Sequence, residues 1–177
     1  MSPNIQARRV AIVGYNRIPF ARHNTNYVNA SNQDMMVAAL NGLIDRYHLQ
    51  GKLLGEVAGG AVIKHSRDFN LMRESVMGTS LDPATPACDL QQACDTGIEA
   101  AIYIANKIAL GQIDVGIAGG TDSTSNVPIV VSESLRKSLL EIRRAKTFGS
   151  KLSQILKIKF KDLAPLAPGI DEPRTGL

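Results

Sequence analysis

The sequence predicts an α/β fold in which a mostly parallel sheet is covered by helices on both faces. Short apolar runs of strand length alternate, over the first 120 residues, with longer segments whose apolar residues recur at helical spacing. This alternation is typical of parallel sheets, because each helix returns the chain across a face of the sheet. The chain has 177 residues, of which 44% are hydrophobic and 20% charged, and this composition is typical of a globular protein.

Four short segments are predicted to be strands. Residues 10–13 (VAIV) form a continuous apolar run, as expected of a strand that is buried on both faces. The other three expected strands are residues 57–63, 86–90 and 114–118, and the last of these ends at a pair of glycines. These strands supply the core of the predicted sheet.

Helices are predicted between the strands. Residues 31–34 (SNQD) form a capping-box-like helix start, with Asp in place of the preferred Glu. A short helix is expected over residues 69–77, and an amphipathic helix over residues 98–109 is closed by Gly111. One or two further helices are expected between residues 136 and 161, and the tail after residue 163 has the composition of irregular structure.

Composition argues against several classes of protein. No apolar run approaches the roughly 18 residues that a membrane-spanning helix needs, and the first residues lack the apolar core of a secretory signal. Two cysteines do not make a disulfide framework, so a reducing, cytoplasmic location is expected. The absence of Trp and the scarcity of other aromatic residues argue against a module that stacks on nucleic-acid bases.

Positive charge is concentrated in one segment of the chain. Nine Lys and Arg residues stand between Arg136 and Lys161, against the single acid Glu141, although the net charge of the whole chain is only +4. Such a segment favours a polyanionic partner, which could be the phosphates of a ligand, an acidic lipid surface or nucleic acid.

Cys94 occupies the junction between an expected strand and an expected helix, in the stretch DLQQACDTGIEAA. The N-terminus of a helix favours a thiolate, and its free N–H groups can hold the oxyanion of an attacked carbonyl. The alternative is that Cys94 is a small buried apolar residue, as free cysteines usually are. Cys88 lies inside the expected strand and is interpreted as a core residue.

These residues carry a resemblance to a known family. DLQQACDTGIEAA resembles the nucleophile motif of thiolases, in which a strand end rich in Asn and Gln precedes Cys, a small residue, Ser or Thr, and Gly. VAIVGYNRIPFAR, AGGTDSTSNVP and EPRTGL resemble other thiolase segments in the same order. The resemblance covers essentially the whole chain. The basic segment, with AKTFGSKL and FKDLAP, is most similar to the β-subunit of the fatty-acid oxidation multienzyme complex.

The resemblance implies a fold and an activity. It implies a thiolase-type half-fold over residues 1–121 and the start of a basic loop domain over residues 122–177. The implied reaction is the thiolytic cleavage of 3-ketoacyl-CoA to acetyl-CoA and a shortened acyl-CoA, or the reverse condensation. Cys94 is then the catalytic nucleophile that becomes acylated, and its backbone N–H contributes to the oxyanion hole. Coenzyme A is the implied co-substrate, with no tightly bound cofactor and no metal.

Two departures from the family pattern bear on activity. Thiolases activate the nucleophile with a histidine in a G-H-P context and use a second cysteine in C-x-G, but His23, His48, His65 and Cys88 match neither pattern. We therefore expect an N-terminal piece of a longer enzyme, with the C-terminal half absent and no turnover alone. Asp95, where Gly or Ala is usual, is the second departure.

Other functions are less well supported. One alternative is a non-catalytic half-thiolase that acts as a binding or assembly partner, in which Cys94 would be structural. A ketoacyl synthase fits less well, because serine-rich sequence usually follows the nucleophile in that group. The single glycine in VAIVGYNR does not satisfy the G-x-G-x-x-G pattern of a dinucleotide-binding fold.

The resemblance also implies partners. It implies a homo-oligomer in the complete protein and a hydratase/dehydrogenase α-subunit. For the basic segment, proximity to CoA and contact with an anionic membrane surface are equally supported, and both are favoured over nucleic acid.

Overall fold

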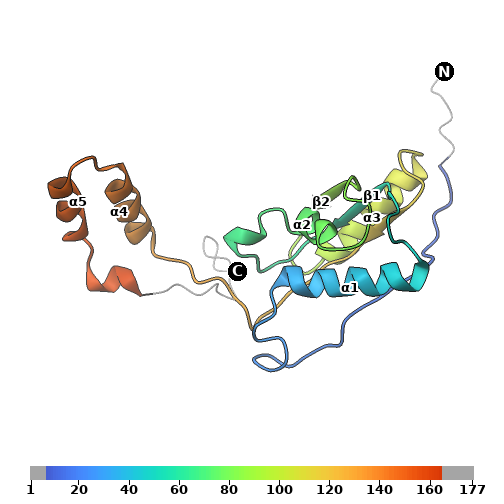
Figure 1. The fold of residues 1–177 in the computed structure, drawn as a ribbon, viewed down its shortest axis with the longest axis horizontal. Helices are drawn as coiled ribbons and strands as arrows, with labels where there is room; N and C mark the ends of the chain where they lie inside the picture. Colours follow the sequence, from blue (N-terminus) through green and yellow to red (C-terminus); the bar gives the residue numbers. More distant parts are fainter. Residues whose placement is uncertain (1–6, 165–177) are drawn as a thin grey trace, which may run out of the picture. The chain divides into compact units, whose positions relative to one another are not determined.

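The computed structural model describes residues 7–164 of the chain. The chain divides into two compact units, Met1–Asn126 and Val127–Leu177, which are drawn in Figure 1. The first unit holds the sheet, three α-helices and a 3-10 helix (Ser66–Asp68). The described residues of the second unit include two α-helices and a 3-10 helix (Phe160–Leu163). The expected irregular tail falls almost entirely on residues 165–177, which lie outside the described part of the chain.

A three-stranded parallel sheet forms the centre of the first unit, in the order β2-β1-β3. The strands are β1 (Glu56–Gly59), β2 (Ala87–Asp89) and β3 (Gly116–Ala118). In the middle strand, Val57 is paired with Ala87 on one side and with Ile117 on the other. The parallel sheet is therefore confirmed, although each strand is shorter than the apolar run that predicted it.

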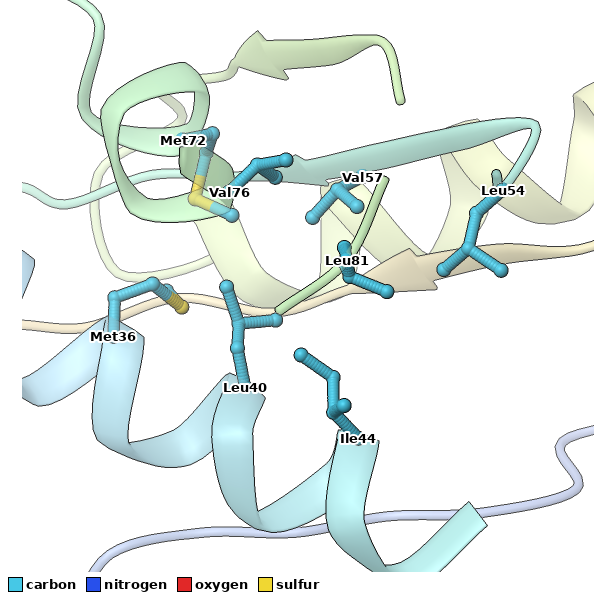
Figure 2. Close-up of a cluster of buried hydrophobic side chains, with 8 residues drawn as sticks. All are labelled: Met36, Leu40, Ile44, Leu54, Val57, Met72, Val76 and Leu81. Carbon is cyan, nitrogen blue, oxygen red and sulfur yellow. The ribbon is translucent and has the colours of Figure 1, made fainter. Parts of the chain in front are cut away.

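Helices cover both faces of this sheet, as predicted. Val57 faces a cluster built with α1 (Asn32–Tyr47) and α2 (Leu71–Met77), whereas the next residue, Ala58, packs against α3 (Thr96–Ala109). Successive strand residues point to opposite faces, so the two helix layers lie on opposite sides. Figure 2 shows the first cluster: Met36, Leu40, Ile44, Leu54, Val57, Met72, Val76 and Leu81.

α1 begins at the predicted capping box. The Ser31 hydroxyl oxygen accepts the Asp34 N–H at 3.1 Å, and the Asp34 carboxylate accepts the Ser31 N–H at 2.9 Å. The hydrogen bonds from Ser31 hold the pKa of the Asp34 carboxyl below its ordinary value of 3.8. The helix closes at His48, whose backbone is left-handed with φ of 54°.

Replacing Ser31 with alanine is expected to lower the free energy of unfolding by about 1 kcal/mol at pH 7. Because the folded-state pKa of Asp34 is lowered, the stability that Asp34 contributes is present above its unfolded-state pKa of about 4 and is lost on acidification through the folded-state pKa. The difference between Ser31→Ala and the unaltered chain should therefore shrink between pH 7 and pH 3 in urea unfolding. A difference that stays constant with pH would contradict this account.

The prediction of a strand at residues 10–13 is wrong. Ile12 and Val13 are 92% and 80% exposed, and no hydrogen-bonded strand forms there. The segment is irregular, and the N–H of Arg8 donates to the carbonyl of Ala109 at 2.9 Å. An apolar, β-branched run forms a strand only where a neighbouring strand supplies backbone partners, and none of the described residues does so here.

The second unit is built around two helices, α4 (Glu133–Arg144) and α5 (Phe148–Ile155). The expectation of one or two helices in the basic segment is therefore confirmed. Within the described part of this unit, Leu135 and Asp162 are the buried residues, while Phe148 is 81% exposed. Over residues 7–164, no helix is both long and apolar enough to cross a membrane.

Candidate active site

Cys94 lies in a short turn between the end of β2 and the start of α3. Its side chain is exposed, as are the neighbouring residues from Gln91 to Asp95. The interpretation of Cys94 as a buried core residue is therefore wrong for this structure. An exposed thiol next to a helix N-terminus is placed where a reagent or substrate can reach it.

The turn around Cys94 is closed by hydrogen bonds on both sides of the thiol. The hydroxyl oxygen of Thr96 accepts the N–H of Gln92 at 2.9 Å, and the same hydroxyl donates to the carbonyl of Ala93 at 2.7 Å. The N–H of Asp95 also donates to the carbonyl of Gln92, at 3.0 Å. Cys94 is thus held between residues whose backbone groups are fixed.

Ala93, immediately before the thiol, has a left-handed backbone with φ of 45°. A residue that carries a Cβ occupies this conformation at a cost of roughly 1–2 kcal/mol. Such strain persists only where surrounding contacts determine the backbone, and it is concentrated at functional sites. The strained residue therefore stands directly before the position that presents Cys94.

The Asp89 carboxylate anchors the start of this turn. Its oxygens accept the N–H groups of Leu71 at 3.0 Å and Met72 at 2.7 Å, and the Lys64 ammonium lies 3.3 Å away. The Asp89 side chain is only 15% exposed. The last residue of β2 is thereby fixed to the beginning of α2.

Glycines allow the segments around the turn to approach closely. A Cβ on Gly60 would lie 2.0 Å from the carbonyl oxygen of Leu90, and one on Gly120 would lie 3.8 Å from the Cα of Gly97. The segments that follow β1 and β3 therefore come up against the turn and the first turn of α3. The pair Gly119-Gly120, which the sequence suggested as either a CoA contact or a tight strand exit, lies at this edge of the sheet.

The segment after β3 is fixed in the same way. The Asp122 carboxylate accepts the N–H groups of Val62 and Ile63, each at 2.9 Å. His65 Nε2 lies 3.0 Å from the side-chain oxygen of Asn126. Because the carboxyl ends of parallel strands share one edge of a sheet, these contacts and the Cys94 turn belong to the same end of the first unit.

Cys88 differs from Cys94 in its surroundings. It is half-buried beside Glu56, which forms an ion pair with Lys107. Burial raises the pKa of the Cys88 thiol, and the adjacent Glu56 raises that pKa further. Since the thiolate is the reactive form, Cys88 is the poorer nucleophile of the two positions by its environment.

The remaining candidate residues do not gather at the thiol. His65 contacts Asn126, His23 Nδ1 lies 3.2 Å from the Thr124 hydroxyl, and His48 ends α1. Asp95 is exposed and makes no side-chain cap on α3. Within residues 7–164 there is no cluster of three or more His, Cys, Asp or Glu side chains that could hold a metal ion.

Sequence reasoning missed the residues that fix the site, namely Asp89, Thr96, Asp122 and Gly60. The role of Thr96 could have been predicted from the sequence, because Ser and Thr side chains at the start of a helix often form hydrogen bonds with backbone groups a few residues earlier. The bonds of Asp89 and Asp122 reach residues 17 to 60 positions away in the chain, so no local pattern reveals them.

The chain is similar to known proteins in sequence and in fold. Residues 10–162 match the family model of the thiolase N-terminal domain. The chain is 38% identical over 174 residues to the 3-ketoacyl-CoA thiolases of Shewanella oneidensis and Shewanella piezotolerans, covering 98% of this chain and 40% of each relative. The chain thus spans less than half the length of these relatives.

A similar fold is found among solved structures. The crystal structure of the Bacillus anthracis acetyl-CoA acetyltransferase aligns with a TM-score of 0.68 and 22% sequence identity, over 73% of this chain and 33% of that chain. The alignment shows a shared fold.

Proposed function

This chain belongs to the thiolase family, and we propose on that basis that it carries the nucleophile of an acyltransferase that acts on 3-ketoacyl-CoA. In the proposed reaction, the Cys94 thiolate attacks the ketone carbon of the substrate. The bond between the α-carbon and this carbon then breaks, and acetyl-CoA leaves after its carbanion takes up a proton. The shortened acyl group remains on Cys94 as a thioester, and the thiol of CoA accepts it in the second step.

The observation that carries this proposal is the exposed Cys94 thiol in a closed turn at the start of α3. Backbone N–H groups at this position, including that of Cys94, would stabilise the oxyanion formed when the carbonyl is attacked. The half-buried Cys88 lacks this setting. Activation of the thiol by a histidine and the proton transfer by a second cysteine would come from residues outside this chain.

We also propose that the second unit binds phosphate groups. Its described residues include nine Lys and Arg, alongside exposed apolar side chains such as Phe148 and Leu156. Cations of this density suit the phosphates of CoA, and their mixture with apolar residues suits an anionic membrane surface equally. The proposal also includes assembly of the complete protein into a homo-oligomer and its association with a hydratase/dehydrogenase α-subunit. It further includes a cytoplasmic location and a role in fatty-acid β-oxidation.

The proposal predicts that iodoacetamide modifies Cys94 faster than Cys88 at pH 7. The exposed thiol is accessible, whereas burial raises the pKa of Cys88 and reduces its thiolate fraction. The difference between the two rates should narrow as pH rises towards the raised pKa of Cys88, because the thiolate fraction of Cys88 then increases. Peptide mapping by mass spectrometry measures both rates in one sample, and Cys88→Ala and Cys94→Ala are matched controls.

A second measurement tests whether substrate protects either thiol from modification. Acetoacetyl-CoA should slow the modification of Cys94 and leave that of Cys88 unchanged, because only Cys94 is proposed to meet the acyl group. Faster modification of Cys88, or protection of Cys88 alone, would contradict the proposed function.

A further inference from the structure

We propose that Thr96 is a positioning residue for Cys94, acting through the turn that holds the thiol. This inference deepens the proposed function and rests on it only in naming Cys94 as the reacting group. Thr96 is the first residue of α3 and is 4% exposed. Its side chain is therefore enclosed by the turn.

The Thr96 hydroxyl both donates and accepts a hydrogen bond within the turn. It accepts the N–H of Gln92 at 2.9 Å and donates to the carbonyl of Ala93 at 2.7 Å. These two residues directly precede Cys94. One side chain thus links the peptide group before Gln92 to the peptide group that joins Ala93 to Cys94.

The methyl group of Thr96 also packs within the fold. A Cβ on Gly60 would come within 3.0 Å of the Thr96 methyl carbon, so this methyl group faces the end of β1. β-branched side chains have few accessible rotamers, and contact on the methyl side restricts the hydroxyl further. The rotamer that bridges Gln92 and Ala93 is therefore set by packing.

The two hydrogen bonds of the Thr96 hydroxyl hold the backbone of Ala93 in a left-handed conformation. Its φ of 45° is unfavourable for a residue with a Cβ, and the Ala93 carbonyl is the group to which Thr96 donates. The Ala93 carbonyl also accepts the backbone N–H of Thr96, at the longer distance of 3.3 Å. Without the hydroxyl bond, this longer contact is left to hold the peptide before Cys94 in its unfavourable conformation. Thr96 thereby keeps Cys94 in the one orientation that the closed turn permits.

Orientation matters for acyl transfer more than for simple alkylation. Attack on a carbonyl requires the sulfur and the oxyanion-binding N–H groups to be placed together, and a displacement of about 1 Å can cost roughly a hundredfold in rate. Alkylation by iodoacetamide displaces iodide at a tetrahedral carbon and forms no oxyanion. A positioning residue should therefore affect the first reaction and spare the second.

The experiment compares Thr96→Val, which keeps the shape and removes the hydroxyl, with Thr96→Ser, which keeps the hydroxyl and removes the methyl group. Each full chain is incubated with acetyl-CoA, so that the Cys94–acetyl thioester forms, the acetyl–CoA thioester breaks and CoA thiol is released. This acetylation is expected to be slow, because the histidine proposed to activate the thiol lies outside this chain, so the variants are compared by their initial rates. Mass spectrometry follows acetylation of Cys94 and, separately, its alkylation by iodoacetamide. Hydrogen exchange of the Gln92 amide, measured by NMR, reports the bond itself.

In Thr96→Val we expect acetylation of Cys94 to fall at least tenfold and the Gln92 amide to exchange about tenfold faster, as loss of one hydrogen bond implies. Alkylation should stay within about twofold of the unaltered chain. Thr96→Ser should resemble the unaltered chain in all three measurements, because its hydroxyl can make both bonds.

Three results would overturn the proposal: unchanged acetylation in Thr96→Val, an equal loss of acetylation and alkylation, or a Thr96→Ser chain as impaired as Thr96→Val. The last result would show that the hydroxyl alone does not position the thiol, because Thr96→Ser retains the hydroxyl. If Thr96→Val fails to fold, a Thr96→Ser chain with acetylation about tenfold below that of the unaltered chain overturns the proposal. Acetyl label on Cys88 in place of Cys94 in the unaltered chain would refute the proposed function instead. Unchanged exchange of the Gln92 amide in Thr96→Val overturns the Thr96 proposal whatever the acetylation result, because the bond would then not be the one that holds the turn.

Discussion

Replacement of Gly60 by alanine is expected to lower the free energy of unfolding by about 3 kcal/mol, the upper part of the range for overpacking. The new methyl carbon would lie 2.0 Å from the carbonyl oxygen of Leu90, well inside van der Waals contact. Displacement of Leu90 would cost free energy, because its N–H donates to the carbonyl of Gly59 at 2.7 Å. Urea unfolding monitored by circular dichroism measures the loss.

Gly97 provides a matched control for this substitution. It lies in the first turn of α3, three residues after the candidate nucleophile, and no atom stands within 4 Å of the position of an added Cβ. Alanine is favoured over glycine in a helix by about 1 kcal/mol, so Gly97→Ala should be neutral or stabilising. Equal loss of stability in Gly60→Ala and Gly97→Ala would show that close packing at Gly60 is not the cause.

Asp89→Ala is expected to lower the free energy of unfolding by a similar amount, about 3 kcal/mol. The substitution leaves the N–H groups of Leu71 and Met72 without an acceptor, and both residues are buried. Each buried donor that loses its partner costs about 1–3 kcal/mol. The Lys64 ammonium also loses its carboxylate partner. Urea unfolding again measures the change.

Two variants separate this effect from a general loss of charge. Asp89→Asn keeps one oxygen that can accept a backbone N–H, and it should retain about half of the stability lost in Asp89→Ala. Asp114→Ala removes an exposed carboxylate that pairs with Arg8 at the surface, and such pairs contribute little. If Asp114→Ala and Asp89→Ala were equally destabilising, the anchoring role of Asp89 would be wrong.

The sequence predicted the elements whose signals are local. The capping box at Ser31 is a bond between residues three positions apart, and the structure contains it where expected. The exit from β3 at Gly119-Gly120 and the start of α3 near Cys94 follow in the same way from runs of apolar residues and from glycine. Such features depend on neighbouring residues and can be identified without knowing the fold.

Features that depend on distant partners could not be predicted. Residues 10–13 have the composition of a buried strand but meet no strand among the described residues, so Ile12 and Val13 remain exposed. In the sequence, Asp89 is an ordinary acidic residue at the end of an expected strand. The structure shows that α2 begins beside it and donates backbone N–H groups to its carboxylate. The sequence thus located the thiol, whereas the side chains that hold its turn became apparent only in the folded chain.

The most direct test of the central proposal is to find where an acyl group becomes attached. The chain is incubated with acetyl-CoA, digested, and fragmented in the mass spectrometer, so that Cys88 and Cys94 are distinguished within one peptide. The proposed function predicts a single acetyl group on Cys94, retained in Cys88→Ala and lost in Cys94→Ala. An acetyl group on Cys88, or label that survives Cys94→Ala, would contradict the assignment of Cys94 as the nucleophile.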